Sequence, residues 1–110
     1  ALAIDAARNS IYLTFDNNGN NDSVERFDIS TGGSQLVLVN DLRLPGDVEV
    51  DRSTGRVYWA VPSETADNAR IESSAPDGTD RREEAGTQSG EIGQPTWLAI
   101  DESTGSLYWS

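Results

Sequence analysis

Four residue types are absent from this chain of 110 residues: cysteine, histidine, methionine and lysine. Without cysteine there are no disulfides, thiolate metal sites or cysteine nucleophiles. Without histidine the chain lacks the commonest general base and metal ligand, and a Ser-His-Asp triad within it is excluded. No apolar run approaches the roughly 20 residues that a membrane-spanning helix needs.

Basic charge is scarce as well. The chain has eight arginines and 19 acidic residues, which gives a formal net charge of −11. A chain this acidic repels nucleic acid and anionic membrane surfaces, because both are bound through clusters of Lys and Arg. We therefore expect no nucleic-acid partner and no membrane insertion, and we favour cations or basic proteins as partners.

One pattern occurs three times along the chain. Its copies are ALAIDAARNSIYLTF at residues 1–15, PGDVEVDRSTGRVYWAV at 45–61 and PTWLAIDESTGSLYWS at 95–110. Each copy is an apolar run ending in Asp, a polar turn, and a second apolar run that carries Tyr. The Asp residues mark the period, since 46 residues separate Asp5 from Asp51 and 50 separate Asp51 from Asp101. A repeat of this length made of strand–turn–strand units predicts a propeller or another repeat array.

The second apolar run of each copy predicts a strand that is buried on both faces. The runs are Ile11 to Leu13, Val57 to Trp59 and Leu107 to Trp109, and each is apolar at successive positions. A sheet that lies between two similar sheets, as in a propeller blade, provides that environment. The turns before these runs end in Asn9, Gly55 and Gly105, residue types that tolerate the positive φ of tight hairpins.

The remaining segments of each repeat supply two further strands. We therefore expect an all-β chain that forms about two and a half four-stranded blades of a larger, six-bladed β-propeller. Blade one covers residues 1–44, blade two covers 45–94, and the first two strands of a third blade cover 95–110. The expected partners are the remaining blades of the same propeller or other protein subunits.

The second run of each copy resembles the YWTD repeat, also called the low-density lipoprotein receptor class B repeat. Its Tyr-Trp is matched by Tyr58-Trp59 and by Tyr108-Trp109, while the first copy keeps the Tyr and the Thr of the motif, at Tyr12 and Thr14. The preceding apolar-x-apolar-Asp run and Thr-Gly turn match as well. The Asp that ends the family motif is replaced by Phe15 and Val61, so the chain resembles a divergent form of the repeat.

The resemblance implies a non-catalytic adhesion or protein-binding propeller in the extracellular part of a secreted or cell-surface protein. Two alternatives remain open. One is a structural building block of a surface coat or filament, and the other is a fragment of a metal-dependent, lactonase-like propeller hydrolase. No catalytic constellation is visible among the residues, so we do not expect an enzyme.

One loop contains the candidate ligands for a metal ion and a candidate modification site. Its alternating Asp16, Asn18, Asn20 and Asp22 offer the oxygen ligands that Ca²⁺ prefers, although no Glu follows at the EF-hand spacing. A plain Asn/Gly hairpin tip is the favoured interpretation, and no other cofactor is expected. The sequon at Asn21 makes that residue a glycosylation candidate if the chain passes through a eukaryotic secretory pathway.

Two further sets of residues have both a functional and a structural interpretation. Asp5, Asp51 and Asp101 form either a ring of carboxylates around a cation or a set of turn caps, and we favour the caps. The repeated Tyr and Trp residues form either a carbohydrate platform or the packing between blades, and we favour the packing. The charged segment 81–84 predicts a solvent-exposed outer strand.

Overall fold

The computed structural model describes residues 1–17, 21–62, 69–86 and 95–110. Within these ranges the chain is built from strands, with a single 3-10 turn. No helix in the described part is long and apolar enough to cross a membrane. The elements are β1 (Leu2–Asp5), η1 (Ala6–Arg8), β2 (Ser10–Phe15), β3 (Asp22–Asp28), β4 (Ser34–Leu42), β5 (Val48–Val50), β6 (Val57–Val61), β7 (Arg70–Ser74), β8 (Arg82–Gly86), β9 (Leu98–Asp101) and β10 (Ser106–Trp109).

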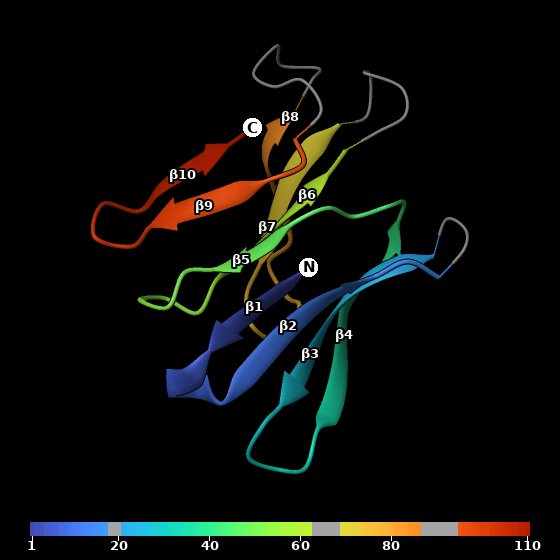
Figure 1. The fold of residues 1–110 in the computed structure, drawn as a ribbon, viewed down its shortest axis with the longest axis vertical. Coiled ribbons are helices and arrows are strands. Elements are labelled where there is room, and N and C mark those ends of the chain that lie inside the picture. Colours follow the sequence, from blue (N-terminus) through green and yellow to red (C-terminus); the bar gives the residue numbers. More distant parts are fainter. Residues whose placement is uncertain (18–20, 63–68, 87–94) are drawn as a thin grey trace.

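The strands form three antiparallel sheets that follow one another along the chain. The first sheet has the order β1-β2-β3-β4, the second has the order β5-β6-β7-β8, and the third pairs β9 with β10. Figure 1 shows the sheets in succession, and β5 contacts β1 on one side and β9 on the other. These are consecutive blades with their first strands adjacent, so the expected all-β propeller fragment is confirmed.

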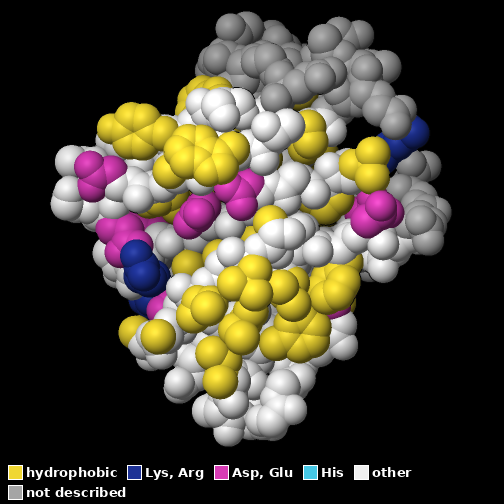
Figure 2. Space-filling view, viewed as in Figure 1, with side chains coloured by type: hydrophobic (Ala, Val, Ile, Leu, Met, Phe, Trp, Pro, Cys, Tyr) yellow, Lys and Arg dark blue, Asp and Glu magenta, His cyan; other side chains and the backbone are white. Residues whose placement is uncertain are grey.

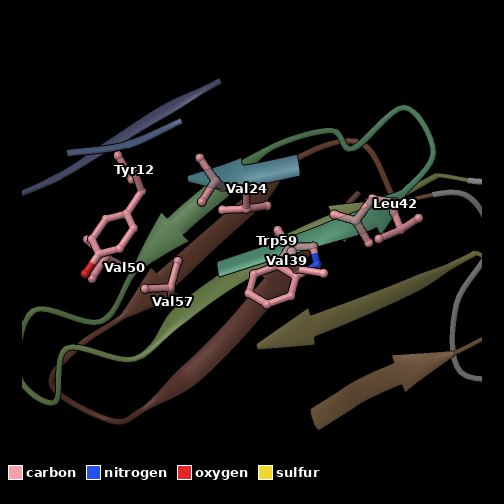
Figure 3. Close-up of a cluster of buried hydrophobic side chains, with 10 residues drawn as sticks. Tyr12, Val24, Val39, Leu42, Val50, Val57 and Trp59 are labelled. Atoms are coloured by element: carbon pink, nitrogen blue, oxygen red, sulfur yellow. The ribbon is translucent and has the colours of Figure 1, made fainter. Parts of the chain in front are cut away.

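The first and second sheets pack face to face through a hydrophobic core. The second sheet contributes Val48, Val50, Val57, Trp59 and Val61, and the first sheet contributes Ala3, Tyr12, Val24, Val39 and Leu42. Figure 3 shows the Trp59 indole beside Val39 and the Tyr12 ring beside Val50. Tyr12 and Trp59 have no exposed surface. Because large aromatic side chains bury the most apolar area, these two residues dominate the interface energetically.

A second, smaller core joins the second and third sheets. It contains Ala60, Ile71 and Leu98, with Tyr58 and Leu107 packed against it. Successive side chains of a strand point to opposite faces. Tyr58 therefore faces the third sheet while Trp59 faces the first, and the prediction that this strand is buried on both faces is confirmed.

The turns after β1, β5 and β9 adopt the backbone conformation that their last residues predict. Asn9 has φ 52°, Gly55 has φ 84° and Gly105 has φ 74°. In the first copy, where Gly is absent, Asn9 ends the 3-10 turn η1 and donates its backbone N–H to the Ala6 carbonyl oxygen. Three different sequences thus satisfy one backbone requirement.

We expect Gly55→Ala to lower the free energy of unfolding more than Gly105→Ala. Both positions have positive φ, where an L side chain costs about 1–2 kcal/mol. At Gly55 a Cβ atom would also lie 2.7 Å from Arg8 Nε and 3.0 Å from Pro76 Cγ, whereas Gly105 has nothing within 4 Å. The crowding at Gly55 should add roughly 1 kcal/mol or more.

Urea unfolding of the native protein with each substitution measures this difference. Equal losses for the two variants would show that the sheets do not approach each other at Gly55.

Candidate functional site: the turn rim

The three turns that follow the first strands form a connected edge, which we call the turn rim (residues 5–9, 51–55 and 101–105). Arg8 of the first turn donates from Nη1 to the carbonyl oxygen of Arg52 in the second turn, over 3.0 Å. The Arg52 Nε then pairs with Glu102 Oε1 of the third turn at 2.7 Å. The three repeat turns therefore lie in series along one edge of the stacked sheets, as their equivalence in sequence suggests.

The repeated aspartates bind their own turns. Asp51 Oδ1 accepts hydrogen bonds from the Ser53 N–H at 2.9 Å and from Ser53 Oγ at 2.6 Å. Asp101 makes the same pair of bonds with Ser103 at 3.0 and 2.6 Å. Asp5 is fully buried, caps η1 through the Arg8 N–H and pairs with Arg8 Nη1 at 2.9 Å. Each carboxylate thus has partners within its own turn.

The same Asp-x-Ser/Thr arrangement recurs in two outer turns. Asp28 accepts from the Ser30 N–H and Oγ at 2.8 and 2.7 Å, and Asp77 accepts from the Thr79 N–H and Oγ at 3.0 and 2.6 Å. Hydrogen bonds to the ionised carboxylate stabilise it. The Ser30 and Thr79 hydroxyls, followed by the amides of the same residues, lower the pKa of Asp28 and Asp77. Sequence reasoning missed this wider use of the motif, although an Asp two residues before Ser or Thr at successive turns is a visible signal.

The candidate calcium ligands are only partly within the described residues. Asn18 and Asn20 lie outside them, and Asp16 is exposed. Asp22 is fully buried, with one carboxylate oxygen accepting the Asn17 N–H at 2.7 Å and the other accepting the Leu44 N–H at 2.6 Å. No group of three or more acidic, His or Cys side chains in the described part of the chain is placed to hold a metal ion. The Asp22 carboxylate therefore accepts hydrogen bonds from backbone amides, and the calcium site stays a prediction.

The candidate glycosylation site lies directly before β3. Asn21 is exposed, and its carbonyl oxygen accepts a hydrogen bond from Asn17 Nδ2 at 3.1 Å. The hydroxyl residue of the sequon, Ser23, is 2% exposed and donates to Glu25 Oε2 at 2.5 Å. Modification of Asn21 stays a prediction.

The repeated aromatic residues fall into two groups. Tyr12, Tyr58 and Trp59 lie in the two cores between sheets. Tyr108 is 56% exposed and Trp109 is 38% exposed on the third sheet. Figure 2 shows hydrophobic surface gathered there and over the first sheet. Tyr108 differs from Tyr12 and Tyr58 because only the first two copies have a further described sheet against the Tyr side.

Polar links between sheets are contacts that sequence reasoning missed. Asp47 Oδ2 accepts the Leu98 N–H at 2.9 Å, and Arg26 Nη1 donates to the Pro76 carbonyl oxygen at 2.6 Å. Arg81 pairs with Asp41 of the first sheet at 3.0 Å. Arg81 is exposed like the rest of the segment 81–84, but it also joins two sheets. No local signal marks such pairs, because the partners lie 40 to 51 residues apart.

The chain is similar to segments of larger proteins. No protein-family model matches it. The protein cueball of Drosophila grimshawi is 32% identical over 111 residues, which cover 99% of this chain and 17% of that protein. The protein cueball of Drosophila virilis is 27% identical over 109 residues, covering 99% and 16%.

A solved structure agrees over nearly the whole chain. A chain in the crystal structure of a nidogen/laminin complex matches with a TM-score of 0.78 and 28% identity, covering 98% of this chain and 38% of that chain. The chain thus spans only about a sixth of the curated relatives' length.

We expect Ser103→Ala to raise the pKa of Asp101 toward its ordinary value. The Ser103 hydroxyl, followed by the Ser103 amide, lowers that pKa in the folded chain. A lowered folded-state pKa adds stability that is complete above the unfolded-state value of about 4 and is lost as the pH falls through the folded-state value. Removing the hydroxyl should shrink this contribution above a pH of about 4 and leave stability unchanged at acid pH, where the contribution is already lost.

Carboxyl-resonance NMR titration of the native protein gives the Asp101 pKa directly. Ser106→Ala, in the same hairpin, is the control. An Asp101 pKa that is unchanged in Ser103→Ala would contradict the cap.

Proposed function

We propose that this chain is part of an extracellular, YWTD-type propeller that binds another protein and carries out no catalysis. The observation that carries the proposal is the match to a chain in a structure of a complex between two proteins. That match covers 98% of this chain with a TM-score of 0.78. The match to two curated proteins over 99% of the chain, but only 17% and 16% of their length, supports the view that the chain is part of a larger protein.

The use of the polar residues supports a binding role over a catalytic one. The aspartates of the repeat turns cap those turns, and the buried glutamate Glu72 is held by Arg70 and Arg81. Among the described residues no acidic cluster suits a catalytic metal, so the propeller-hydrolase alternative gains no support. The remaining feature is the acidic character of the chain, whose formal net charge of −11 favours a partner with a basic face.

A surface coat or filament block is the second candidate. The observation that favours it is the apolar surface on the two outer sheets, with Leu2 on the first and Tyr108 on the third both 56% exposed. Contiguous exposed apolar surface marks sites of association.

Binding to laminin tests the proposal, because laminin is named in the matching complex. We expect the native protein to bind immobilised laminin with an association rate that falls as salt is raised. Glu102→Lys should lower that rate at least about threefold, because Glu102 lies on the turn rim and charge there steers encounter. Its ion pair with the 63% exposed Arg52 contributes little stability, so thermal unfolding should barely change.

Glu83→Lys is the matched control, since it makes the same charge change on the outer strand β8. Absence of laminin binding by the unmodified protein would overturn a laminin-type partner. If both variants lower the association rate equally, the turn rim is not the part of the surface that binds laminin.

A further inference from the structure

The outer face of the first sheet is apolar with a single acidic side chain at its centre. This face, which we call the outer face, points away from the second sheet and is visible as the hydrophobic patch over the first sheet in Figure 2. Leu2, Ile4 and Val37 on it are 56%, 48% and 44% exposed. Glu25 stands in the same register row as Leu13 and Val37, yet it is only 8% exposed. The other apolar members of the face are Ile11, Phe15 and Phe27.

The equivalent face of the second sheet shows what covers such a surface. Val48 and Val50 occupy the places that Leu2 and Ile4 hold in the first copy of the repeat, and Trp59 occupies the place of Leu13. All three pack against the first sheet. The third sheet repeats the arrangement, with Leu98 buried against the second sheet. In the second and third sheets, therefore, this apolar face is covered by the preceding sheet of the repeat.

Glu72 of the second sheet is the positional counterpart of Glu25. Glu25 is opposite Leu13 in the register, and Glu72 is opposite Trp59. Glu72 accepts a hydrogen bond from Trp59 Nε1 at 3.2 Å. It also pairs with Arg70 Nε at 2.5 Å and Arg81 Nη2 at 2.8 Å. At the face that is covered, the buried carboxylate is thus balanced by two guanidinium groups.

Glu25 has neutral partners instead. Ser23 Oγ donates to it at 2.5 Å, and Gln35 Nε2 donates to its other oxygen. Ser23 and Gln35 stand where the second sheet has Arg70 and Arg81. All eight arginines lie in the described ranges, and none of the ion pairs there involves Glu25. An apolar sheet laid over Glu25 would remove the remaining water from a carboxylate that has no cation, and such burial is strongly unfavourable.

We infer that the outer face is covered by a further sheet of this repeat that brings an Arg or Lys side chain to Glu25. The Phe15 and Phe27 rings, whose centroids are 6.2 Å apart, lie in the rows on either side of the Glu25 row. They offer aromatic surface to the same cation. The third sheet of a second copy does not fit, because residues 95–110 contain no basic residue.

Matched substitutions in the native protein test the inference. Glu25→Gln and Glu72→Gln remove the same charge from equivalent places. If Glu25 has a cationic partner, both variants remove the charge of a buried carboxylate that is paired with at least one cation, and both should lower the thermal midpoint by roughly 4 °C or more. An unchanged or raised midpoint for Glu25→Gln, with a lowered midpoint for Glu72→Gln, would overturn the inference.

An experimental structure of the unmodified native protein decides the matter if Glu25→Gln does not fold. An Arg or Lys nitrogen from another repeat sheet within about 4 Å of the Glu25 carboxylate, the ordinary ion-pair distance, supports the inference. A purely apolar cover, the third sheet of a second copy, or open solvent over Glu25 overturns it.

Discussion

The packing of one sheet face against the next is the interaction on which the rest of this structure depends. A four-stranded sheet of this size has no core of its own, so its apolar side chains gain stability only where a second sheet covers them. β6 shows the principle in two adjacent residues. Trp59 is buried against the first sheet, and Tyr58 packs toward the third. The sheets are therefore units of a series, and each derives part of its stability from its neighbours.

Polar groups fix the register of that series. Within a turn, Asp51 and Asp101 hold the backbone amides of the following residues. Between turns, Arg8 and Arg52 reach the next copy of the repeat. The many acidic residues of this chain are therefore explained in good part by turn geometry and by pairing with arginine.

The sequence predicted the features that local residue patterns determine. The three-fold repeat predicted antiparallel strands, and the identity of Asn9, Gly55 and Gly105 predicted turns with positive φ, all of which the structure confirms. Contacts between residues far apart in the chain could not be predicted from the sequence. Nothing near Arg81 in the chain points to Asp41, and nothing near Asp47 points to the Leu98 amide.

Equivalent positions also diverge for a reason that local sequence does not contain. Tyr12 is buried and Tyr108 is 56% exposed although both occupy the Tyr place of the repeat. The second sheet packs over Tyr12, whereas no described sheet packs over Tyr108. The packing of a neighbouring sheet therefore determines whether the Tyr is buried. Glu25 and Glu72 differ in a similar way. They occupy equivalent register positions, but Glu25 is hydrogen-bonded to neutral side chains and Glu72 is paired with two arginines.

The free energy of unfolding of Trp59→Ala in the native protein tests the central claim most directly. Trp59 is fully buried in the core between the first two sheets. Truncating it to Ala should therefore lower the free energy of unfolding by about 3–5 kcal/mol. Trp97→Ala is the comparison, because Trp97 is 53% exposed and its removal should cost about 1 kcal/mol or less. Similar, small losses for both variants would contradict the account, since they would mean that the two sheets are not held together through Trp59.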